Sequence, residues 1–243
     1  MIVTIRSLIF IFCISITVVL YAGLIIVVTP FTNHLVASRI ATAWGRINIH
    51  LLRYICGLKH EIDGWENLPT DRSFIIMAKH QSAWETITLR GLLPFNQAWV
   101  LKEELLRLPF FGRALKNSKQ IAIDRKAGKR ALKQLLTQGR QALDEGRIVI
   151  VFPEGTRTAV GESRKYNIGG AMLAEKSGAH VVPIAHNAGV FWPRNSLQKH
   201  PGTIRVVVGE PLDMSGLKAG EINQAVSDWI EKTMASLPNQ RDD

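Results

Sequence analysis

The hydrophobic pattern divides the chain into two regions. Residues 8–29 are almost wholly apolar, and no residue from 7 to 38 carries a formal charge. A helix over these 22 residues is about 33 Å long, enough to cross a hydrocarbon core of about 30 Å. From residue 59 onward, short apolar runs alternate with helical patterns. We therefore expect an N-terminal membrane anchor with an amphipathic helical segment in residues 1–58, and one folded domain in residues 59–243.

A cleaved signal peptide is the alternative explanation of the apolar run. The run is longer than the usual apolar stretch of about 7–15 residues, and its end at Thr29 and Pro30 lacks a small-x-small cleavage site. We therefore expect an anchor that stays on the chain, as a full span or as a re-entrant hairpin. Only Arg6 precedes the run, whereas several basic residues follow it, which favours the inner membrane with the domain on the cytoplasmic side.

The segment after Pro30 has a polar stripe. Arg39, Arg46 and Arg53 recur at seven-residue intervals, close to one face of a helix, and apolar residues surround them. This pattern predicts either a helix that lies on or dips into the membrane, or an ordinary amphipathic helix packed on the domain.

The remaining chain alternates two kinds of pattern. Apolar runs rich in β-branched residues predict strands at 74–78, 98–101, 120–123, 147–152, 180–185 and 204–208. Helical patterns follow at 83–93, 109–117, 127–145, 169–177 and 220–237. This alternation predicts an α/β fold with a mostly parallel central sheet flanked by helices.

The composition restricts the class of partner. The chain has 30 Lys and Arg against 20 Asp and Glu, a formal net charge of +10, which suits nucleic acid, an anionic membrane, or acidic substrates and carrier proteins. The basic residues are dispersed and form no nucleic-acid-binding motif, which argues against nucleic acid. Cys13 and Cys56 are the only cysteines, too few for a disulfide framework or a zinc cluster.

A histidine follows the first predicted strand of the domain. His80 lies between a strand and a helix, where α/β proteins place reactive side chains. An imidazole can take a proton from a hydroxyl at neutral pH, and a carboxylate such as Glu85 can orient its ring. They can pair only if His80 lies in the loop, because five residues correspond to about 140° around a helix. Ser82 and Glu85 also match a capping box, a competing use of the same carboxylate.

Three other strand ends carry basic residues. The run at 147–152 leads into a Pro-Glu-Gly-Thr-Arg turn, and the planar guanidinium of Arg157 suits a phosphate, although a surface arginine in a turn fits the pattern equally well. Arg125 follows the run at 120–123 and is a second candidate. Lys102 follows the run at 98–101 and has a plainer explanation as a solvated charge.

These motifs together resemble those of the glycerolipid acyltransferase family typified by bacterial 1-acylglycerol-3-phosphate acyltransferases. The family has a His-x4-Asp motif, a strand ending in Ile-Asp-Arg, a Phe-Pro-Glu-Gly-Thr-Arg motif and an apolar strand with a proline. The corresponding stretches here are 80–85, 120–125, 152–157 and 181–184, and the resemblance covers roughly residues 74–210.

The resemblance implies transfer of a fatty acyl group from acyl-CoA or an acyl carrier protein to the sn-2 hydroxyl of 1-acyl-glycerol-3-phosphate, giving phosphatidic acid. It implies His80 as the general base and Glu85 as the residue that orients it. The acceptor would be bound by Arg125, Glu154, Gly155, Thr156, Arg157 and Lys102. Membrane phospholipids and the lysophospholipid would be the partners. No metal or cofactor is called for, because the hydroxyl can attack the thioester directly.

Two positions depart from the family pattern: Gln120 stands where glycine or another small residue is often found, and Glu85 is the plainer departure. Glu85 stands where Asp is commonest, and its longer side chain can contact the imidazole if the backbone lies slightly farther away. Another acceptor, such as a lyso-ornithine lipid, lysophosphatidylglycerol or glycerol 3-phosphate, would use the same motifs. A non-catalytic lipid-binding membrane protein with this fold is the alternative of a different class.

Overall fold

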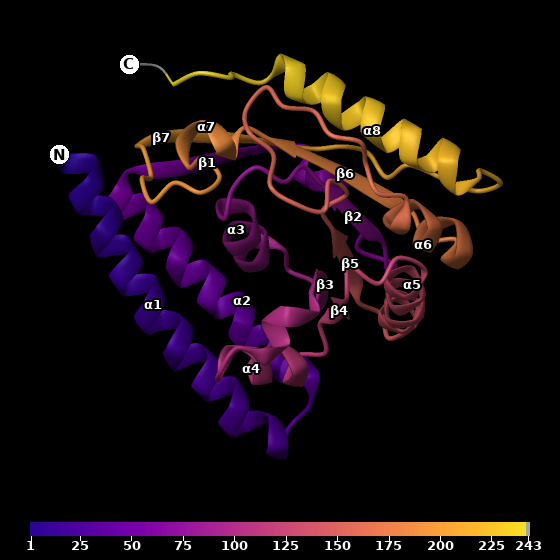
Figure 1. Cartoon of the computed structure of the whole chain (residues 1–243), viewed down its shortest axis with the longest axis horizontal. Coiled ribbons are helices and arrows are strands. Elements are labelled where there is room, and N and C mark those ends of the chain that lie inside the picture. The colour runs from indigo at the N-terminus through magenta and orange to yellow at the C-terminus, as the bar shows by residue number, and fades with distance from the viewer. Residues whose placement is uncertain (242–243) are drawn as a thin grey trace.

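Helices surround one seven-stranded sheet in the computed structural model, which describes residues 1–241 (Figure 1). The helices are α1 (Ile2–Val28), α2 (His34–Leu51), α3 (Trp84–Leu92), α4 (Phe111–Asn117), α5 (Lys129–Asp144), α6 (Gly169–Ser177), α7 (Ala188–Phe191) and α8 (Ala219–Ser236). The strands are β1 (Leu58–Asp63), β2 (Ile75–Ala78), β3 (Gln97–Lys102), β4 (Ile121–Ile123), β5 (Ile148–Val151), β6 (Val181–His186) and β7 (Gly202–Val208).

The sheet is mostly parallel, as the alternation of patterns predicted. Its strand order is β1-β7-β6-β2-β5-β3-β4, and the strands from β6 to β4 all run in one direction. Strand β7 pairs antiparallel with β6, and β1 pairs parallel with β7, so this edge of the sheet runs the other way. The α/β prediction is confirmed, whereas β1 and the reversed edge were not predicted.

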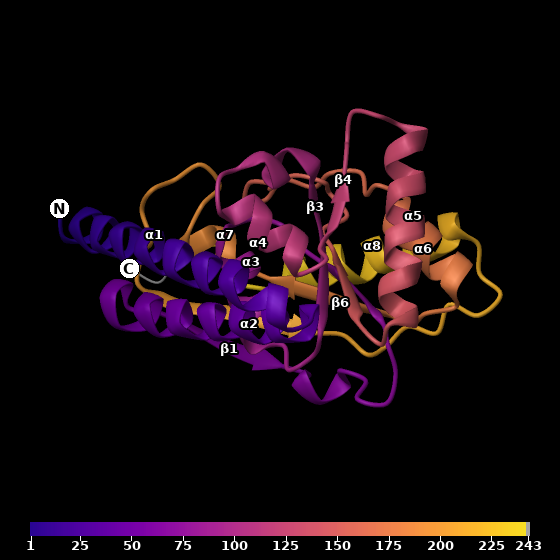
Figure 2. The same cartoon turned by 90° about the horizontal axis from the view of Figure 1, so that it is seen from below.

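Both faces of the sheet are covered by helices, and the alternation of residues along β2 shows how (Figures 1 and 2). Ile76 belongs to a core that includes Leu52 from the N-terminal helices and Trp84 from α3. Ile75 and Met77 belong to a second core beneath α5, α6 and α8. A strand buried on both faces has a continuous apolar sequence, which is why the sheet core was easy to find from sequence.

Helices α1 and α2 form a hairpin whose turn contains Pro30 (Figure 1). The side chain of Asn33 caps α2 by accepting the backbone N–H of Leu35 at 3.0 Å. Of the described helices, residues 2–31 alone are long and apolar enough to cross a membrane, with a mean hydropathy of 2.8. Its outward side chains are exposed, for example Phe12 at 67% and Val19 at 61%.

Helix α1 is also attached to the domain at both of its ends. Near its start, the hydroxyl of Ser7 accepts the backbone N–H of Lys199 at 2.9 Å. At its end, the amide of Asn117 in α4 donates to the hydroxyl of Thr29 at 2.6 Å. The apolar helix therefore lies along the domain over its whole length and does not project away from it (Figure 2).

Two glycines join this hairpin to the helix that follows the histidine. A Cβ atom on Gly91 of α3 would lie 2.5 Å from the backbone carbon of Gly45 in α2, and one on Gly45 would lie 2.5 Å from the nitrogen of Gly91. The guanidinium of Arg46 donates to the carbonyl of Gly91 at 3.2 Å. The two backbones are therefore in direct contact, and α2 fixes the position of α3.

Candidate active site

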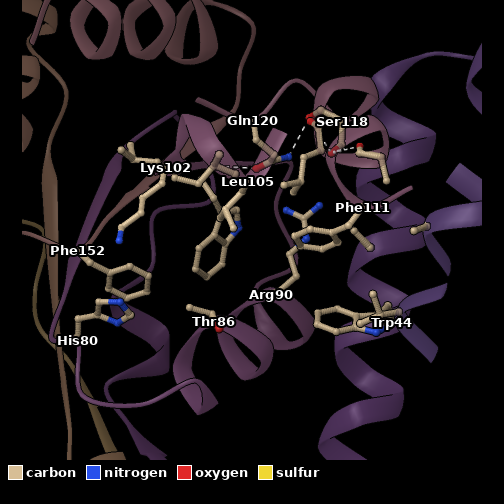
Figure 3. A pocket seen from close by; sticks show the side chains of 18 of the residues that line it. Trp44, His80, Thr86, Arg90, Lys102, Leu105, Phe111, Ser118, Gln120 and Phe152 are labelled. Atoms are coloured by element: carbon tan, nitrogen blue, oxygen red, sulfur yellow. Dashed lines mark hydrogen bonds between the residues drawn. The ribbon is translucent and has the colours of Figure 1, made fainter. Parts of the chain in front are cut away.

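The predicted motifs meet at one edge of the sheet. Strands β2, β3, β4 and β5 run parallel, so their carboxyl ends lie together. His80 follows β2, Lys102 ends β3, Arg125 follows β4, and the turn at 152–157 follows β5. Residues more than seventy positions apart in the sequence thus surround one site (Figure 3).

His80 and Glu85 are paired. The Nδ1 atom of His80 lies 2.7 Å from Oε1 of Glu85, and the imidazole stacks on the ring of Phe152 with the centroids 4.1 Å apart. Helix α3 begins at Trp84, so His80 lies in the loop before it, which is the condition for pairing. The same carboxylate accepts the backbone N–H of Ser82 at 2.8 Å, so Glu85 both orients the ring and holds the loop that precedes α3.

The charge state of Glu85 fixes the tautomer of His80. The Glu85 side chain is fully buried, and burial by itself raises its pKa. The neighbouring histidines and the hydrogen bonds from His80 and Ser82 outweigh burial, so the pKa lies below its usual value. An ionised Glu85 only accepts, so the proton of His80 is on Nδ1 and the lone pair of Nε2 is available as a base.

A second buried histidine lies beyond Glu85. The Nε2 atom of His186, at the end of β6, is 2.8 Å from the carbonyl oxygen of Lys79 and 3.9 Å from Glu85 Oε2. Its Nδ1 accepts the backbone N–H of Ala188 at 3.3 Å, so the proton is on Nε2. Burial lowers the pKa of His186 and keeps it neutral. Sequence analysis missed this residue, although a histidine that closes an apolar strand was a usable signal.

His80 lies at one side of a cavity of about 630 Å³. Lys102, Arg125, Thr156, Arg157 and Arg194 also line it; Lys102 lies on the side of His80, and Arg125 and Arg194 bond to the turn at 152–157, which itself bonds to His80 through Thr158 (Figure 3). Helices α1, α2 and α4 supply the apolar end through Tyr21, Ala22, Ile25, Trp44, Phe111 and Ala114. The cavity thus joins a cationic mouth to the membrane-facing hairpin.

One cation lies inside the apolar part of this cavity. Arg90 of α3 is 6% exposed and donates to Oε1 of Gln97 at 3.3 Å (Figure 3). Burial lowers the pKa of Arg90 to about 9, so the side chain stays charged at neutral pH. The inner wall of the cavity therefore carries a positive charge that sequence analysis did not anticipate.

The turn at 152–157 presents its residues in different directions. Thr156 and Arg157 line the cavity, and Arg125 donates to the carbonyl of Gly155. Gly155 has φ +70°, and a Cβ there would lie 2.8 Å from the amide nitrogen of Asn167, so the turn requires glycine.

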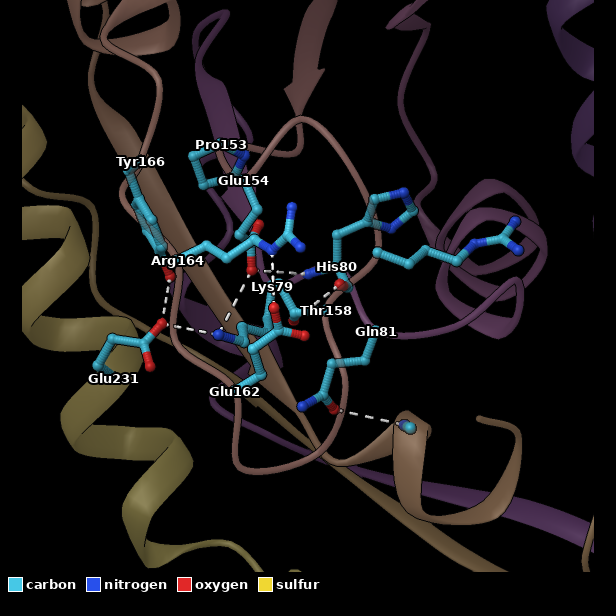
Figure 4. Close-up of polar contacts among 12 residues, drawn as sticks. Lys79, His80, Gln81, Pro153, Glu154, Thr158, Glu162, Arg164, Tyr166 and Glu231 are labelled. Atoms are coloured by element: carbon cyan, nitrogen blue, oxygen red, sulfur yellow. Dashed lines mark hydrogen bonds and ion pairs between the residues drawn. The ribbon is translucent and has the colours of Figure 1, made fainter. Parts of the chain in front are cut away.

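Glu154 points away from the cavity lining and toward the sheet. Its Oε1 accepts the backbone N–H of His80 at 3.2 Å and lies 3.5 Å from the ammonium of Lys79 (Figure 4). The acceptor-binding role predicted for Glu154 and Gly155 stays a prediction, since neither residue lines the cavity.

A base held by a carboxylate, at the mouth of an apolar cavity beside several cations, fits an enzyme that acts on an anionic lipid. Residues 59–187 match the family described as "Acyltransferase". A 1-acyl-sn-glycerol-3-phosphate acyltransferase of Pseudomonas aeruginosa is 46% identical over 198 residues, which cover 80% of this chain and 76% of that protein.

A second relative is similar in sequence, and a solved structure is similar in fold. A protein of the same name from Bacillus subtilis is 31% identical over 73% of this chain and 87% of its own length. The crystal structure of the 1-acyl-sn-glycerophosphate (LPA) acyltransferase PlsC from Thermotoga maritima shares the fold, with a TM-score of 0.79 and 24% identity over 98% of this chain and 97% of that chain. The chain belongs to the acyltransferase family and, within it, to the 1-acyl-sn-glycerol-3-phosphate acyltransferases.

Proposed function

We propose that this protein transfers a fatty acyl group from an acyl thioester to the sn-2 hydroxyl of 1-acyl-glycerol-3-phosphate and thereby forms phosphatidic acid. The observation that carries the proposal is the pair of His80 and Glu85 at the cationic mouth of an apolar cavity. The relatives that share most of the chain bear the name of this activity.

The reaction needs a base and two bound substrates. Nε2 of His80 takes the proton of the acceptor hydroxyl while the oxygen attacks the thioester carbonyl, and Glu85 stabilises the imidazolium that forms. Collapse of the tetrahedral intermediate breaks the carbon–sulfur bond, and the imidazolium returns its proton to the leaving thiolate. The products are the diacyl lipid and a free thiol, and His80 is again neutral.

The cationic mouth supplies the acceptor site in this proposal. Arg125 and Arg157 bind the phosphate, with Lys102 and the hydroxyl of Thr156 beside them, because all four line the cavity close to His80. A guanidinium binds phosphate oxygens through two parallel hydrogen bonds, which makes the arginines the stronger partners. The acyl donor is acyl-CoA or an acyl carrier protein, either of which presents the same thioester.

The exposed apolar face of α1 associates the protein with a membrane. We place it at the inner membrane with the domain on the cytoplasmic side. Because both ends of α1 contact the domain, an orientation along the membrane surface is favoured over a span. The lysolipid then enters from the bilayer through the apolar end of the cavity.

Acyl transfer from a labelled thioester to a panel of lysolipids tests the proposal. Membranes with the wild-type protein are expected to convert lysophosphatidic acid to phosphatidic acid, and His80→Ala is expected to lower turnover about 100-fold or more. Near-normal turnover with His80→Ala would refute the mechanism, and a product from another lysolipid alone would change the acceptor.

Arg157→Ala tests the acceptor site in the same assay. It is expected to raise the KM for lysophosphatidic acid about 10-fold or more, because a charged hydrogen bond contributes about 1.5–3 kcal/mol. Arg164→Ala is the matched control, since Arg164 lies outside the cavity and pairs with Glu162 at 2.9 Å. Equal KM values in the two variants would remove Arg157 from the acceptor site.

A further inference from the structure

A lysine is buried directly behind the candidate base. Lys79 precedes His80 at the end of β2 and is 1% exposed. Moving an ammonium group out of water costs several kcal/mol unless carboxylates compensate it. Lys79 does not line the cavity, and its side chain extends toward Glu231 and away from the imidazole of His80 (Figure 4).

Helix α8 provides the nearest carboxylate for this lysine. Oε1 of Glu231 lies 2.7 Å from Nζ of Lys79, and the hydroxyl of Tyr166 donates to the same oxygen at 2.9 Å. The Glu231 side chain is 30% exposed and comes from a part of the chain that no catalytic motif includes. A residue at the far end of the sequence thus neutralises the charge beside the base.

Glu154 connects the lysine to His80. Its Oε1 lies 3.5 Å from Nζ of Lys79 and accepts the backbone N–H of His80 at 3.2 Å. The carbonyl of His80 accepts the backbone N–H of Thr158 at 2.8 Å, so the backbone of His80 is held on both sides of its Cα atom. Burial raises the pKa of Glu154 above its usual value, and the nearby Lys79 limits that rise by favouring the ionised carboxylate.

We propose that Lys79 and Glu231 are positioning residues for His80. Glu231 fixes the ammonium group of Lys79, Lys79 holds the carboxyl group of Glu154 in place, and Glu154 fixes the backbone from which the imidazole projects. Glu85 fixes the ring itself. The proposal rests on the function proposed above, because it assumes that His80 is the base. It also gives Glu154 a role outside acceptor binding.

Glu85 and Glu154 constrain different parts of His80. Glu85 sets the rotation of the ring, whereas Glu154 sets the position of the atoms that carry it. A displacement of about 1 Å at a reacting group can lower the rate about 100-fold. Loss of the Lys79–Glu231 pair is therefore expected to lower kcat without weakening the binding of either substrate.

Glu231→Gln tests this inference because it removes the charge and keeps the size of a partly exposed side chain. We expect kcat to fall about 10- to 100-fold, with unchanged KM for both the lysolipid and the thioester. Glu221→Gln is the matched control on the same helix, since Glu221 accepts the backbone N–H of Lys218 at 2.8 Å and caps α8. It is expected to lower the melting temperature and leave kcat per folded enzyme unchanged.

A double-mutant cycle tests the connection. If the pair acts as a unit, Lys79→Met combined with Glu231→Gln has the same kcat as Lys79→Met alone. If each substitution lowers kcat independently, so that the two reductions multiply in the double variant, the proposal is contradicted. If Lys79→Met does not fold, the comparison of Glu231→Gln with Glu221→Gln decides by itself.

The remaining outcomes separate this inference from the proposed function. Wild-type kcat in Glu231→Gln, or a raised KM for either substrate, overturns the positioning role while an inactive His80→Ala leaves the mechanism standing. Full turnover in His80→Ala overturns both, because there is then no base to position.

Discussion

At the residue scale, Glu85 shows why two uses of one side chain need not compete. A carboxylate has about four positions at which it can accept a hydrogen bond. Glu85 uses them for the imidazole of His80 and for the backbone N–H groups of Gln81 and Ser82. The hydrogen bonds to the loop backbone hold the carboxylate beside the ring, so the longer glutamate fits a position where aspartate is commoner in the family.

The neighbours Glu154 and Arg157 show the limit of a motif. Both belong to one short turn, and sequence analysis assigned both to the acceptor. The structure directs Arg157 toward the cavity and Glu154 toward Lys79. The direction of each side chain follows from the backbone angles of the turn, including φ +70° at Gly155, and a list of residue types does not contain those angles.

The stability of the fold is expected to fall in acid partly because of His186. Its pKa in the folded protein lies below the ordinary value of 6.5, so as pH falls below about 6.5 the unfolded chain binds the proton first and is favoured. The contribution is complete above that pH. Between pH 7.5 and 5.5, the melting temperature of His186→Gln is therefore expected to fall less than that of the wild-type protein.

Melting curves at the two pH values check this expectation. The pKa values of His34, His60 and His200 are also lowered, each mainly by burial, so part of the decline remains in the variant. Equal declines in wild type and His186→Gln would show that His186 takes up its proton in the folded state as readily as in the unfolded one.

At the element scale, most boundaries followed from the hydrophobic period. The predicted helix at 169–177 matches α6, and α3, α4, α5 and α8 lie within two residues of their predicted limits. Strand β1 was missed because it is half exposed and its sequence, Leu-Lys-His-Glu-Ile-Asp, has no apolar run. The hydrophobic period did not predict the direction of β7, because it carries no information about which strand β7 pairs with.

The contact of Gly45 with Gly91 makes a prediction for these elements. Gly91→Ala must separate α2 from α3, because the added Cβ would lie within 2.6 Å of backbone atoms that cannot rotate away. We expect a loss of about 1–3 kcal/mol, with about 2–4 °C of melting temperature for each kcal/mol.

Gly23→Ala in α1 is the control for that substitution. Apart from the neighbouring residues and backbone of its own helix, nothing lies within 4 Å of a Cβ at this position, and alanine favours a helix by about 1 kcal/mol over glycine. Thermal melts of both variants in the same detergent make the comparison. A Gly91→Ala protein as stable as Gly23→Ala would mean that the two helices are not tightly packed.

At the scale of the whole molecule, the N-terminal hairpin and the domain share a core. Phe10 of α1, together with Leu52 and Cys56 just after α2, packs in one cluster with Ile204 and Val206 of β7. The division at residue 58 stays a prediction, and the packing indicates that the hairpin supports the sheet as well as facing the membrane. The cavity depends on both parts, since α1 and α2 line its apolar end.

Cysteine labelling tests how α1 lies in the membrane. Ile2→Cys and Thr32→Cys, made separately in a Cys13→Ser background, place exposed thiols at the two ends of the helix. An impermeant maleimide is expected to label both from the side that labels Lys232→Cys on α8. Labelling of the two ends from opposite sides of the bilayer would establish a span and exclude the orientation along the surface.

The sequence by itself determined the α/β class and the apolar helix, and it predicted His80, Glu85, Arg125 and Arg157 as site residues, because hydrophobic period and local motif spacing are properties of neighbouring residues. Only the tertiary structure decided which of these residues share the cavity, that Glu154 faces Lys79, and that Glu231 of α8 completes the cluster. Those contacts join positions up to 152 residues apart. They depend on strand order and on how helices pack, which no local pattern specifies.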